Sequence, residues 1–201
     1  IVSTASLIMG VAAAAADKNS ILLAGIAGLV AGAMSMAAGE YVSVSSQSDT
    51  EQADLARERA ELAADPKAEH KELVGIYVDR GLTPETAEEV ARQMAAKDVL
   101  GTHMRDELGI SDMVSARPVQ AAITSAATFS VGAALPLLTA FVFPQSSISV
   151  AVTIASLLFL ALLGAVGARS GGAAILPATI RVTFWGAAAM ALTAIIGRIA
   201  G

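Results

Sequence analysis

The stretch from Ile21 to Val44 reads ILLAGIAGLVAGAMSMAAGEYVSV, an apolar run long enough to cross a bilayer as one helix. It holds one charged side chain, Glu40, and its other polar side chains are serines and a tyrosine. A carboxylate at membrane depth costs several kcal/mol unless it is paired, so it indicates an ion or proton pathway. Met36 lies one helical turn before Glu40 on the same face. A carboxylate and a thioether stacked in this way indicate a transmembrane site for a transition-metal cation.

The chain combines two kinds of sequence. Of its 201 residues 55% are hydrophobic and only 15% are charged, against about 25% in a soluble domain. Residues 49–117 hold 16 of the 18 acidic residues and 9 of the 13 Lys and Arg, a net charge of −7, whereas the remainder has a net charge of +2. The pattern predicts an acidic, water-soluble insert within a membrane protein. Nucleic acid is excluded as a partner because it requires clustered positive charge, whereas an acidic insert suits cations.

Apolar stretches elsewhere predict an all-α membrane protein with five transmembrane helices. The four long ones can each span a bilayer: Ser20–Ser46, Pro118–Phe143, Ser146–Ala168 and Ala174–Ile199. Ile1–Ala16 would rise only about 24 Å as a helix, so we interpret it as the second half of a truncated first span. The predicted organisation is therefore helices 1 (partial) and 2 in residues 1–48, a cytosolic helical metal-binding domain in 49–117, and helices 3–5 in 118–201.

The distribution of Lys and Arg predicts the orientation. Placing the insert in the cytosol puts its nine basic residues, together with Arg169 and Arg181, on that side, which follows the positive-inside rule. The opposite side then holds Lys18 and Arg198. The Ala-rich composition and short loops favour a bacterial plasma membrane as the location.

The insert is expected to be helical throughout, with no strands. Asp49 to Ala64 should continue the second membrane helix into the cytosol. Asp65-Pro66 and Thr83-Pro84 each have the pattern of an N-cap followed by proline at the first helical position, and Gly81 should end the helix between them. A further helical stretch is expected from Lys97 to Leu108, ended by Gly109.

Paired glutamates in the insert indicate a metal site. Glu58 and Glu61 are spaced i, i+3, and Glu69 and Glu72 repeat that spacing after the Asp65-Pro66 turn, so two antiparallel helices could present four carboxylates to one another. A solvated acidic face is the alternative, with these basic partners: Arg57, Arg59, Lys67 and Lys71. Spacing alone leaves both interpretations open.

The chain's sulfur and nitrogen donors are few. Cysteine is absent, so a metal would be held by carboxylate, Met, His or backbone oxygen. Met104 and Glu107 are spaced i, i+3 near the end of the insert, with His103 beside them, and a thioether or imidazole there would favour iron, manganese or zinc over calcium or magnesium. Taken singly, Met104 is typical of a core residue and His103 of a surface residue. We expect His70 to be a surface residue, because it faces away from Glu69 and Glu72.

Small residues recur along the second helix at a spacing of four. Gly28 and Gly32 continue into Met36 and Glu40, and a second stripe contains Ala31, Ser35, Gly39 and Ser43. Small-xxx-small stripes let membrane helices approach closely. They predict a homodimer with this helix near the axis; ordinary packing within the chain is the alternative.

Three segments resemble the vacuolar iron transporter family: Gly28 to Gln47, with its Met-xxx-Gly-Glu-Tyr core, Ile1 to Leu7, and Asp106 to Gly109. The resemblance implies a five-helix, dimeric transporter that exchanges ferrous iron or manganese for protons through a cytosolic metal-binding insert. It also implies the metal ligands. In the insert they are Glu58, Glu61, Glu69, Glu72, Glu107 and Met104 as the soft ligand, and in the membrane they are Met36 and Glu40. His103 stands where the family can offer a second Met, and its role stays open.

The leading hypothesis is a proton-coupled exporter of Fe²⁺ or Mn²⁺ from the cytosol, with Zn²⁺ as a third candidate ion and no prosthetic group. A membrane-anchored metal sensor or buffer is the alternative, although a buffer needs no carboxylate within the bilayer. An enzyme is disfavoured, because no nucleophile–base pair or Gly-rich phosphate loop is present and the Glu cluster lacks the His partners of di-iron oxidases. The expected partners are metal ions, protons, the lipid bilayer and a second copy of the chain. If the source is eukaryotic, the vacuolar membrane is the expected location.

Overall fold

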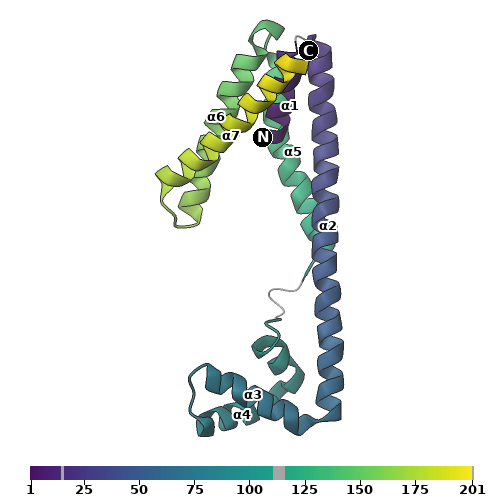
Figure 1. The fold of residues 1–201 in the computed structure, drawn as a ribbon, viewed down its shortest axis with the longest axis vertical. Helices are drawn as coiled ribbons and strands as arrows, with labels where there is room; N and C mark the ends of the chain where they lie inside the picture. Colours follow the sequence, from purple (N-terminus) through teal and green to yellow (C-terminus); the bar gives the residue numbers. More distant parts are fainter. Residues whose placement is uncertain (15, 111–115, 201) are drawn as a thin grey trace. The chain divides into compact units, whose positions relative to one another are not determined.

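A computed structural model describes residues 1–14, 16–110 and 116–200. Within these ranges every regular element is helical and no strand occurs, as the sequence predicts. The elements, labelled in Figure 1, are α1 (Val2–Ala13), α2 (Lys18–Ala64), α3 (Pro66–Asp79), α4 (Pro84–Asp106), α5 (Pro118–Val142), the short 3₁₀ helix η1 (Gln145–Ser147), α6 (Ile148–Ser170) and α7 (Ile175–Ala200).

Four segments of the described chain are long and apolar enough to cross a membrane. They are α2, α5, η1 with α6, and α7. The apolar helix α1 has 12 residues and would rise about 18 Å, which is shorter than a bilayer core. A multi-pass membrane protein is therefore confirmed, and the fifth span stays a prediction.

The chain divides into two compact units, which we describe separately. One comprises Ile1–Gly39 with Ala122–Gly201, and the other comprises Glu40–Ala121. We call them the membrane unit and the insert unit. The predicted segment boundaries at 48/49 and 117/118 remain predictions, because packing does not locate the edge of the bilayer. Residues 111–115 of the predicted metal-binding domain lie outside the described residues.

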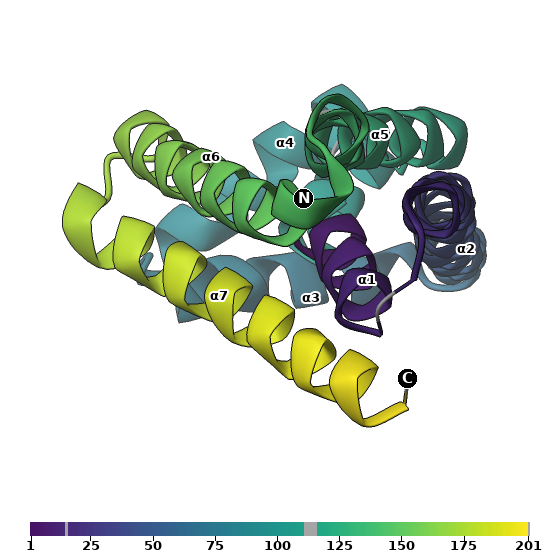
Figure 2. The same ribbon diagram turned by 90° about the horizontal axis from the view of Figure 1, so that it is seen from above.

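The membrane unit is organised around α1. This helix packs against α6 and α7, which also pack against each other (Figure 2). Ile8 of α1, Val152 of α6 and Met190 of α7 are buried in one core cluster. Every fourth residue of α6 is buried: Ile148, Val152, Ser156, Leu160, Gly164 and Ala168. Large apolar side chains on other faces, such as Leu23, Leu158 and Ile199, are exposed, as expected of a surface that faces lipid.

Two loops of the membrane unit are tied together by side chains. The Lys18 ammonium at the start of α2 donates to the carbonyls of Phe141 (2.8 Å) and Phe143 (2.9 Å) at the end of α5. Gln145 donates through Nε2 to the carbonyl of Ala16 (3.1 Å). The lysine satisfies carbonyls that the helix end leaves without partners, and its charge suits the helix C-terminus.

The two glycines of the first small-residue stripe pack within the chain. A Cβ at Gly28 would collide with the Leu7 side chain of α1, and one at Gly32 would collide with the Phe129 ring of α5. Gly28 and Gly32 therefore serve helix packing within the chain, which was the alternative to a dimer contact. The second stripe is exposed along its whole length: Ala31, Ser35, Gly39 and Ser43. A close contact of α2 with another helix through small residues alone would use this second stripe.

We expect Gly32→Leu to destabilise the membrane unit by about 1–3 kcal/mol, because the larger side chain overpacks the contact with Phe129. Thermal unfolding of the detergent-solubilised protein measures the change. Ala27→Leu, at an exposed position of the same helix, is the matched control. Equal unfolding temperatures for the two variants would contradict this account of Gly32.

Helix signals in the insert unit act as the sequence predicts. Asp65 caps α3 by accepting from the backbone N–H groups of Lys67 and Ala68, with Pro66 in the first turn. Thr83 caps α4 in the same way, accepting from the N–H of Thr86. Gly81 lies between the two helices with a φ of 99°, a conformation that side chains with a Cβ avoid.

Helix α4 is interrupted at Asp98. This residue has extended backbone angles (φ −163°, ψ 93°) inside the helix, and its carboxylate accepts from the N–H of Gly101 at 3.0 Å. Asp98 thus caps a final helical segment, which corresponds to the stretch expected from Lys97 to Leu108. Gly109 follows the helix with a φ of 67°. The interruption matters because the final segment carries His103 and Glu107.

Candidate metal centre

Four side chains of the insert unit converge from three helices. Glu58 comes from the end of α2, Glu69 from the first turn of α3, His103 from the last turns of α4, and Glu107 from the C-cap of α4. One ligand atom of each lies within 4.8 Å of those of the others. We call these residues the carboxylate–histidine cluster. Three carboxylates with one imidazole form a donor set suited to a divalent transition metal.

His103 lies at the centre of the cluster. Its Nδ1 is 2.8 Å from Glu107 Oε2, 3.0 Å from Glu58 Oε1 and 4.0 Å from Glu69 Oε2. The residue is 1% exposed. One buried ring nitrogen therefore faces three carboxylates, of which Glu107 is the most accessible to solvent, with 21% of its side chain exposed.

Burial makes this cluster unfavourable for free carboxylates. Glu58 is 1% exposed and Glu69 is 8% exposed. Burial, followed by the negative charge of Glu107, raises the pKa of Glu58 above its usual value. Burial, followed by the charge of Glu72, raises the pKa of Glu69 in the same way. A bound divalent cation would relieve both costs, because it neutralises the charge that burial penalises.

Basic side chains do not neutralise the cluster. Among the described residues, the ion pairs of Glu58, Glu69 and Glu107 are all with His103. Arg57 instead pairs with Asp54 at 2.8 Å, and the other basic residues of the alternative interpretation are exposed: Arg59, Lys67 and Lys71. A solvated acidic face therefore does not describe Glu58 and Glu69.

Local sequence signals explain why these side chains meet. The Asp65-Pro66 turn ends α2 and starts α3 one helical turn before Glu69. The cap at Asp98 redirects the chain ahead of His103. His103 and Glu107 are spaced i, i+4, which puts them on one face of the last turn.

A polar clamp holds the end of α4 against α3. Asp106 accepts from Arg80 Nη1 at 2.6 Å and from the Tyr77 hydroxyl at 3.0 Å. Burial alone would raise the pKa of Asp106, but the hydrogen bonds from Arg80 and Tyr77 outweigh it and lower that pKa. The clamp fixes the residue directly before Glu107, so it positions that carboxylate.

Other predicted insert ligands lie outside the four-residue group. Glu61 and Glu72 are exposed, although their charges act on Glu58 and Glu69 respectively. Met104 is half-buried. The structure therefore brings together Glu58, Glu69 and Glu107, while the ligand roles of Glu61, Glu72 and Met104 stay predictions.

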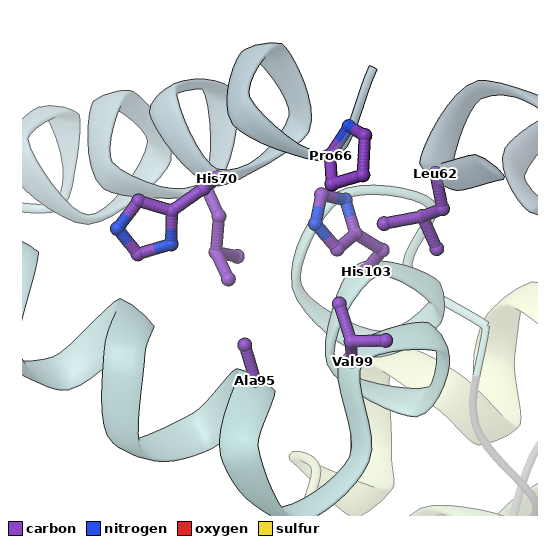
Figure 3. Close-up of a pocket in the computed structure, with 7 residues that line it drawn as sticks. Leu62, Pro66, His70, Ala95, Val99 and His103 are labelled. Carbon is purple, nitrogen blue, oxygen red and sulfur yellow. The ribbon is translucent and has the colours of Figure 1, made fainter. Parts of the chain in front are cut away.

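One of the two histidines differs from the surface position that is typical of a lone histidine. His103 is buried, and the signal that could have identified it is its i, i+4 spacing from Glu107. The side chain of His70 is 32% exposed and its Nε2 lies 2.8 Å from Glu88 Oε1 on α4. A cavity of about 180 Å³ has both histidines in its lining, together with Leu62, Pro66 and Val99 (Figure 3).

The predicted transmembrane ligands lie on α2. Met36 is 49% exposed and Glu40 is also exposed in the single chain. Both positions are on one helix face by spacing. Their role as a transmembrane metal site stays a prediction.

Metal binding to this cluster should weaken as pH falls. The raised pKa values mean that Glu58 and Glu69 take up protons at higher pH than ordinary glutamates, and a metal must displace those protons. Below these pKa values we expect the affinity to fall about tenfold per pH unit for each proton displaced. Calorimetry in buffers of different ionisation enthalpy measures the protons released. Metal affinity that stays constant from neutral pH down to the usual glutamate pKa of 4.5 would contradict this expectation.

The stability of the metal-free insert should change in the opposite direction. A carboxyl group whose folded pKa is raised contributes most below its unfolded pKa, and this contribution is lost as pH rises through the folded value. Glu58 and Glu69 therefore favour the metal-free fold most at low pH, where both are protonated, and favour metal binding at higher pH, where both are ionised.

Comparisons with known proteins identify one family over nearly the whole chain. The model of the VIT family matches residues 1–198. A protein named "Vacuolar iron transporter" from Acanthamoeba castellanii is 48% identical over 186 residues, covering 92% of this chain and 71% of the relative. "Vacuolar iron transporter homolog 1" from Oryza sativa subsp. japonica is 36% identical over 194 residues, with coverage of 96% and 66%. "Vacuolar iron transporter homolog 2.1" from Arabidopsis thaliana is 36% identical over 194 residues, with coverage of 96% and 73%.

The chain spans about two thirds to three quarters of the length of these relatives. A family match over nearly the whole chain makes this a transporter and not an enzyme, as the sequence predicts. The family match confirms the predicted iron transport. The four candidate spans agree with the predicted transmembrane location. This chain belongs to the VIT family, that of the vacuolar iron transporters.

Proposed function

We propose that this protein exports Fe²⁺ or Mn²⁺ from the cytosol in exchange for protons, and that its insert captures the metal. The observation that carries the proposal is the buried carboxylate–histidine cluster in a chain of the VIT family. The names of the relatives specify iron. Manganese follows from the donor set, since carboxylate oxygens suit Mn²⁺.

Capture would take place on the cytosolic side. The acidic insert attracts cations, and the distribution of Lys and Arg supports a cytosolic location for it by the positive-inside rule. Metal bound between Glu58, Glu69 and Glu107 would be released toward the membrane part of α2 when protons compete for the carboxylates. In this scheme the insert loads the transporter and does not carry out the translocation.

A second cavity suggests the route of delivery. It has a volume of about 370 Å³, and the α2 residues that line it lie between Glu40 and Glu58 in the sequence. Glu51 and Asp54 contribute carboxylates to its wall, and Leu108 to Ile110 form the facing wall directly after Glu107. A weakly held cation could pass along these carboxylates.

Translocation would use Met36 and Glu40. A carboxylate at membrane depth can hold a cation or a proton in turn, which couples the two fluxes. Met36 adds a soft donor one turn away and would favour transition metals over Ca²⁺. Both side chains are exposed in the single chain, so the proposal requires that a second copy or a polar cavity face them.

We also propose that the transporter is a homodimer with five spans per chain. The exposed stripe of Ala31, Ser35, Gly39 and Ser43 on α2 offers a small-residue surface for close helix contact. The dimer contact would therefore use this stripe and not Gly28 and Gly32, which pack within the chain. The host membrane would be the plasma membrane in a bacterium and the vacuolar membrane in a eukaryote.

Flux into proteoliposomes under an imposed pH gradient tests the function. Uptake of Fe²⁺ and Mn²⁺ should exceed that of Zn²⁺ and greatly exceed that of Ca²⁺, and it should collapse when the gradient is dissipated. A sensor or buffer would bind the same ions without flux. Metal binding with no uptake under any gradient would favour that alternative.

A further inference from the structure

Glu58 and His103 present a local hydrogen-bonding imbalance. A neutral His103 with its proton on Nδ1 donates to Glu107 Oε2 at 2.8 Å. One proton cannot also satisfy Glu58 Oε1, which is 3.0 Å from the same nitrogen. Within the described residues Glu58 Oε1 is buried without a hydrogen-bond partner, and Glu58 is 1% exposed. Such an atom is costly, because burial removes the water that would otherwise solvate it.

We infer that His103 binds the captured metal directly through Nδ1, together with Glu58, Glu69 and Glu107, so that this chain has a mixed imidazole–carboxylate site. The inference rests on the proposed capture role of the insert. It assigns a ligand role that the sequence leaves open, and it makes His103 the residue that determines metal preference.

The distances suit a shared cation. Adjacent ligand atoms around a metal with bonds of about 2.0–2.2 Å lie roughly 3 Å apart. The separations of Nδ1 from Glu107 Oε2 (2.8 Å) and Glu58 Oε1 (3.0 Å) match this spacing. The distance from Nδ1 to Glu69 Oε2 is 4.0 Å, which lies between the separation of adjacent ligand atoms and that of ligand atoms on opposite sides of a metal. A cation replacing the Nδ1 proton would satisfy all three carboxylates, which one proton cannot do.

The other side of the ring fits this assignment. When Nδ1 binds a metal, a neutral imidazole carries its proton on Nε2. His103 Nε2 is buried and, among the described residues, has no hydrogen-bond partner. His103 lines the cavity of about 180 Å³ that His70 also lines (Figure 3). This volume accommodates a water that could accept from Nε2 and contact His70, which would fix the tautomer required for metal binding.

A nitrogen ligand changes the metal preference. Imidazole suits Zn²⁺ and Fe²⁺, whereas an all-oxygen site suits Mn²⁺ and Mg²⁺. We therefore expect His103→Gln to weaken Zn²⁺ binding by at least about tenfold, comparable to losses seen when support of a metal ligand is removed, and to weaken Mn²⁺ binding less. The preference should shift toward manganese.

Pulsed electron paramagnetic resonance on the Mn²⁺-loaded full chain tests the inference. The chain has only two histidines, so a protein without a histidine tag contains only two imidazoles. At up to one equivalent of Mn²⁺, coordinated ¹⁴N should be detected in the parent, and its spectrum should change when histidine is labelled with ¹⁵N. His70→Gln is the matched control and should keep the signal, as should Met104→Leu. His103→Gln should lose it.

The parent spectrum alone can overturn the proposal. A parent that binds Mn²⁺ in a carboxylate-dependent manner but shows no nitrogen coupling would exclude His103 as a ligand, even if His103→Gln failed to fold. A nitrogen signal that survives in folded His103→Gln would exclude it as well. Because no flux is measured, a protein that does not transport metal would still give a result on His103.

Discussion

Glu40→Gln is expected to reduce pH-driven metal flux in proteoliposomes to the level of protein-free vesicles. The amide keeps the shape of the side chain but cannot trade a cation for a proton, and Met36 alone is a weak ligand for a hard divalent ion. Since Glu40 is the one acidic residue in the apolar run Ile21 to Val44, no nearby carboxylate can replace it. Uptake of Fe²⁺ or Mn²⁺ under an imposed pH gradient measures the loss.

Three comparisons make this result specific to the transmembrane site. Metal binding to the insert should be largely unchanged in Glu40→Gln, because the carboxylate–histidine cluster lies elsewhere on the insert unit. Glu40→Asp keeps a carboxylate and should retain part of the flux. Met36→Leu removes softness and not charge, so it should shift selectivity among metals more than it abolishes transport. Parent-level flux in Glu40→Gln would refute proton exchange at this residue.

The helices of the insert could be predicted because their signals are local. Asp65-Pro66 and Thr83-Pro84 cap and start helices through contacts within three residues, and Gly81 and Gly109 take conformations that few other residues adopt. The membrane-spanning helices could be predicted equally well, since crossing a bilayer requires a long uninterrupted apolar stretch. Such features depend on neighbours in sequence and not on the final packing.

Burial at the metal centre could not be predicted in the same way. The i, i+3 pairs identify Glu58, Glu61, Glu69 and Glu72 as equivalent, but the packing of α2, α3 and α4 buries only Glu58 and Glu69. Which member of each pair is buried depends on how the helices rotate about their axes. The burial of His103 could not be predicted either, because it depends on how the last turns of α4 pack against α2 and α3.

The small-residue stripe shows a different limit of sequence reasoning. Spacing identified close helix contact at Gly28 and Gly32, but it could not distinguish contact within the chain from contact between copies. In the structure Gly28 packs against Leu7 of α1, and Gly32 packs against Phe129 of α5, so both contacts are within the chain. Only the three-dimensional structure distinguishes the packed face of α2, with Gly28 and Gly32, from the exposed face of the same helix.

The double variant Glu58→Gln/Glu69→Gln should abolish the rise in unfolding temperature that metal gives the parent protein. Both carboxylates belong to the buried cluster, so we expect a loss of affinity of at least about 100-fold at the insert, the upper range for damage to a supporting group. Titration of the solubilised chain with Fe²⁺, Mn²⁺ or Zn²⁺, followed by thermal unfolding, measures both effects. Exposed Glu61→Gln/Glu72→Gln should cause a smaller loss.

Without metal, the same double variant should unfold at a temperature equal to or higher than that of the parent at neutral pH. The raised pKa values of Glu58 and Glu69 show that their charged forms are unfavourable in the folded insert, and the amides remove that cost. Asp79→Asn/Glu85→Gln removes two carboxylates about 15 Å or more along the helices from the cluster and should alter neither metal binding nor this balance. A double variant that is less stable without metal and still stabilised by metal would mean that Glu58 and Glu69 support the fold and do not bind the ion.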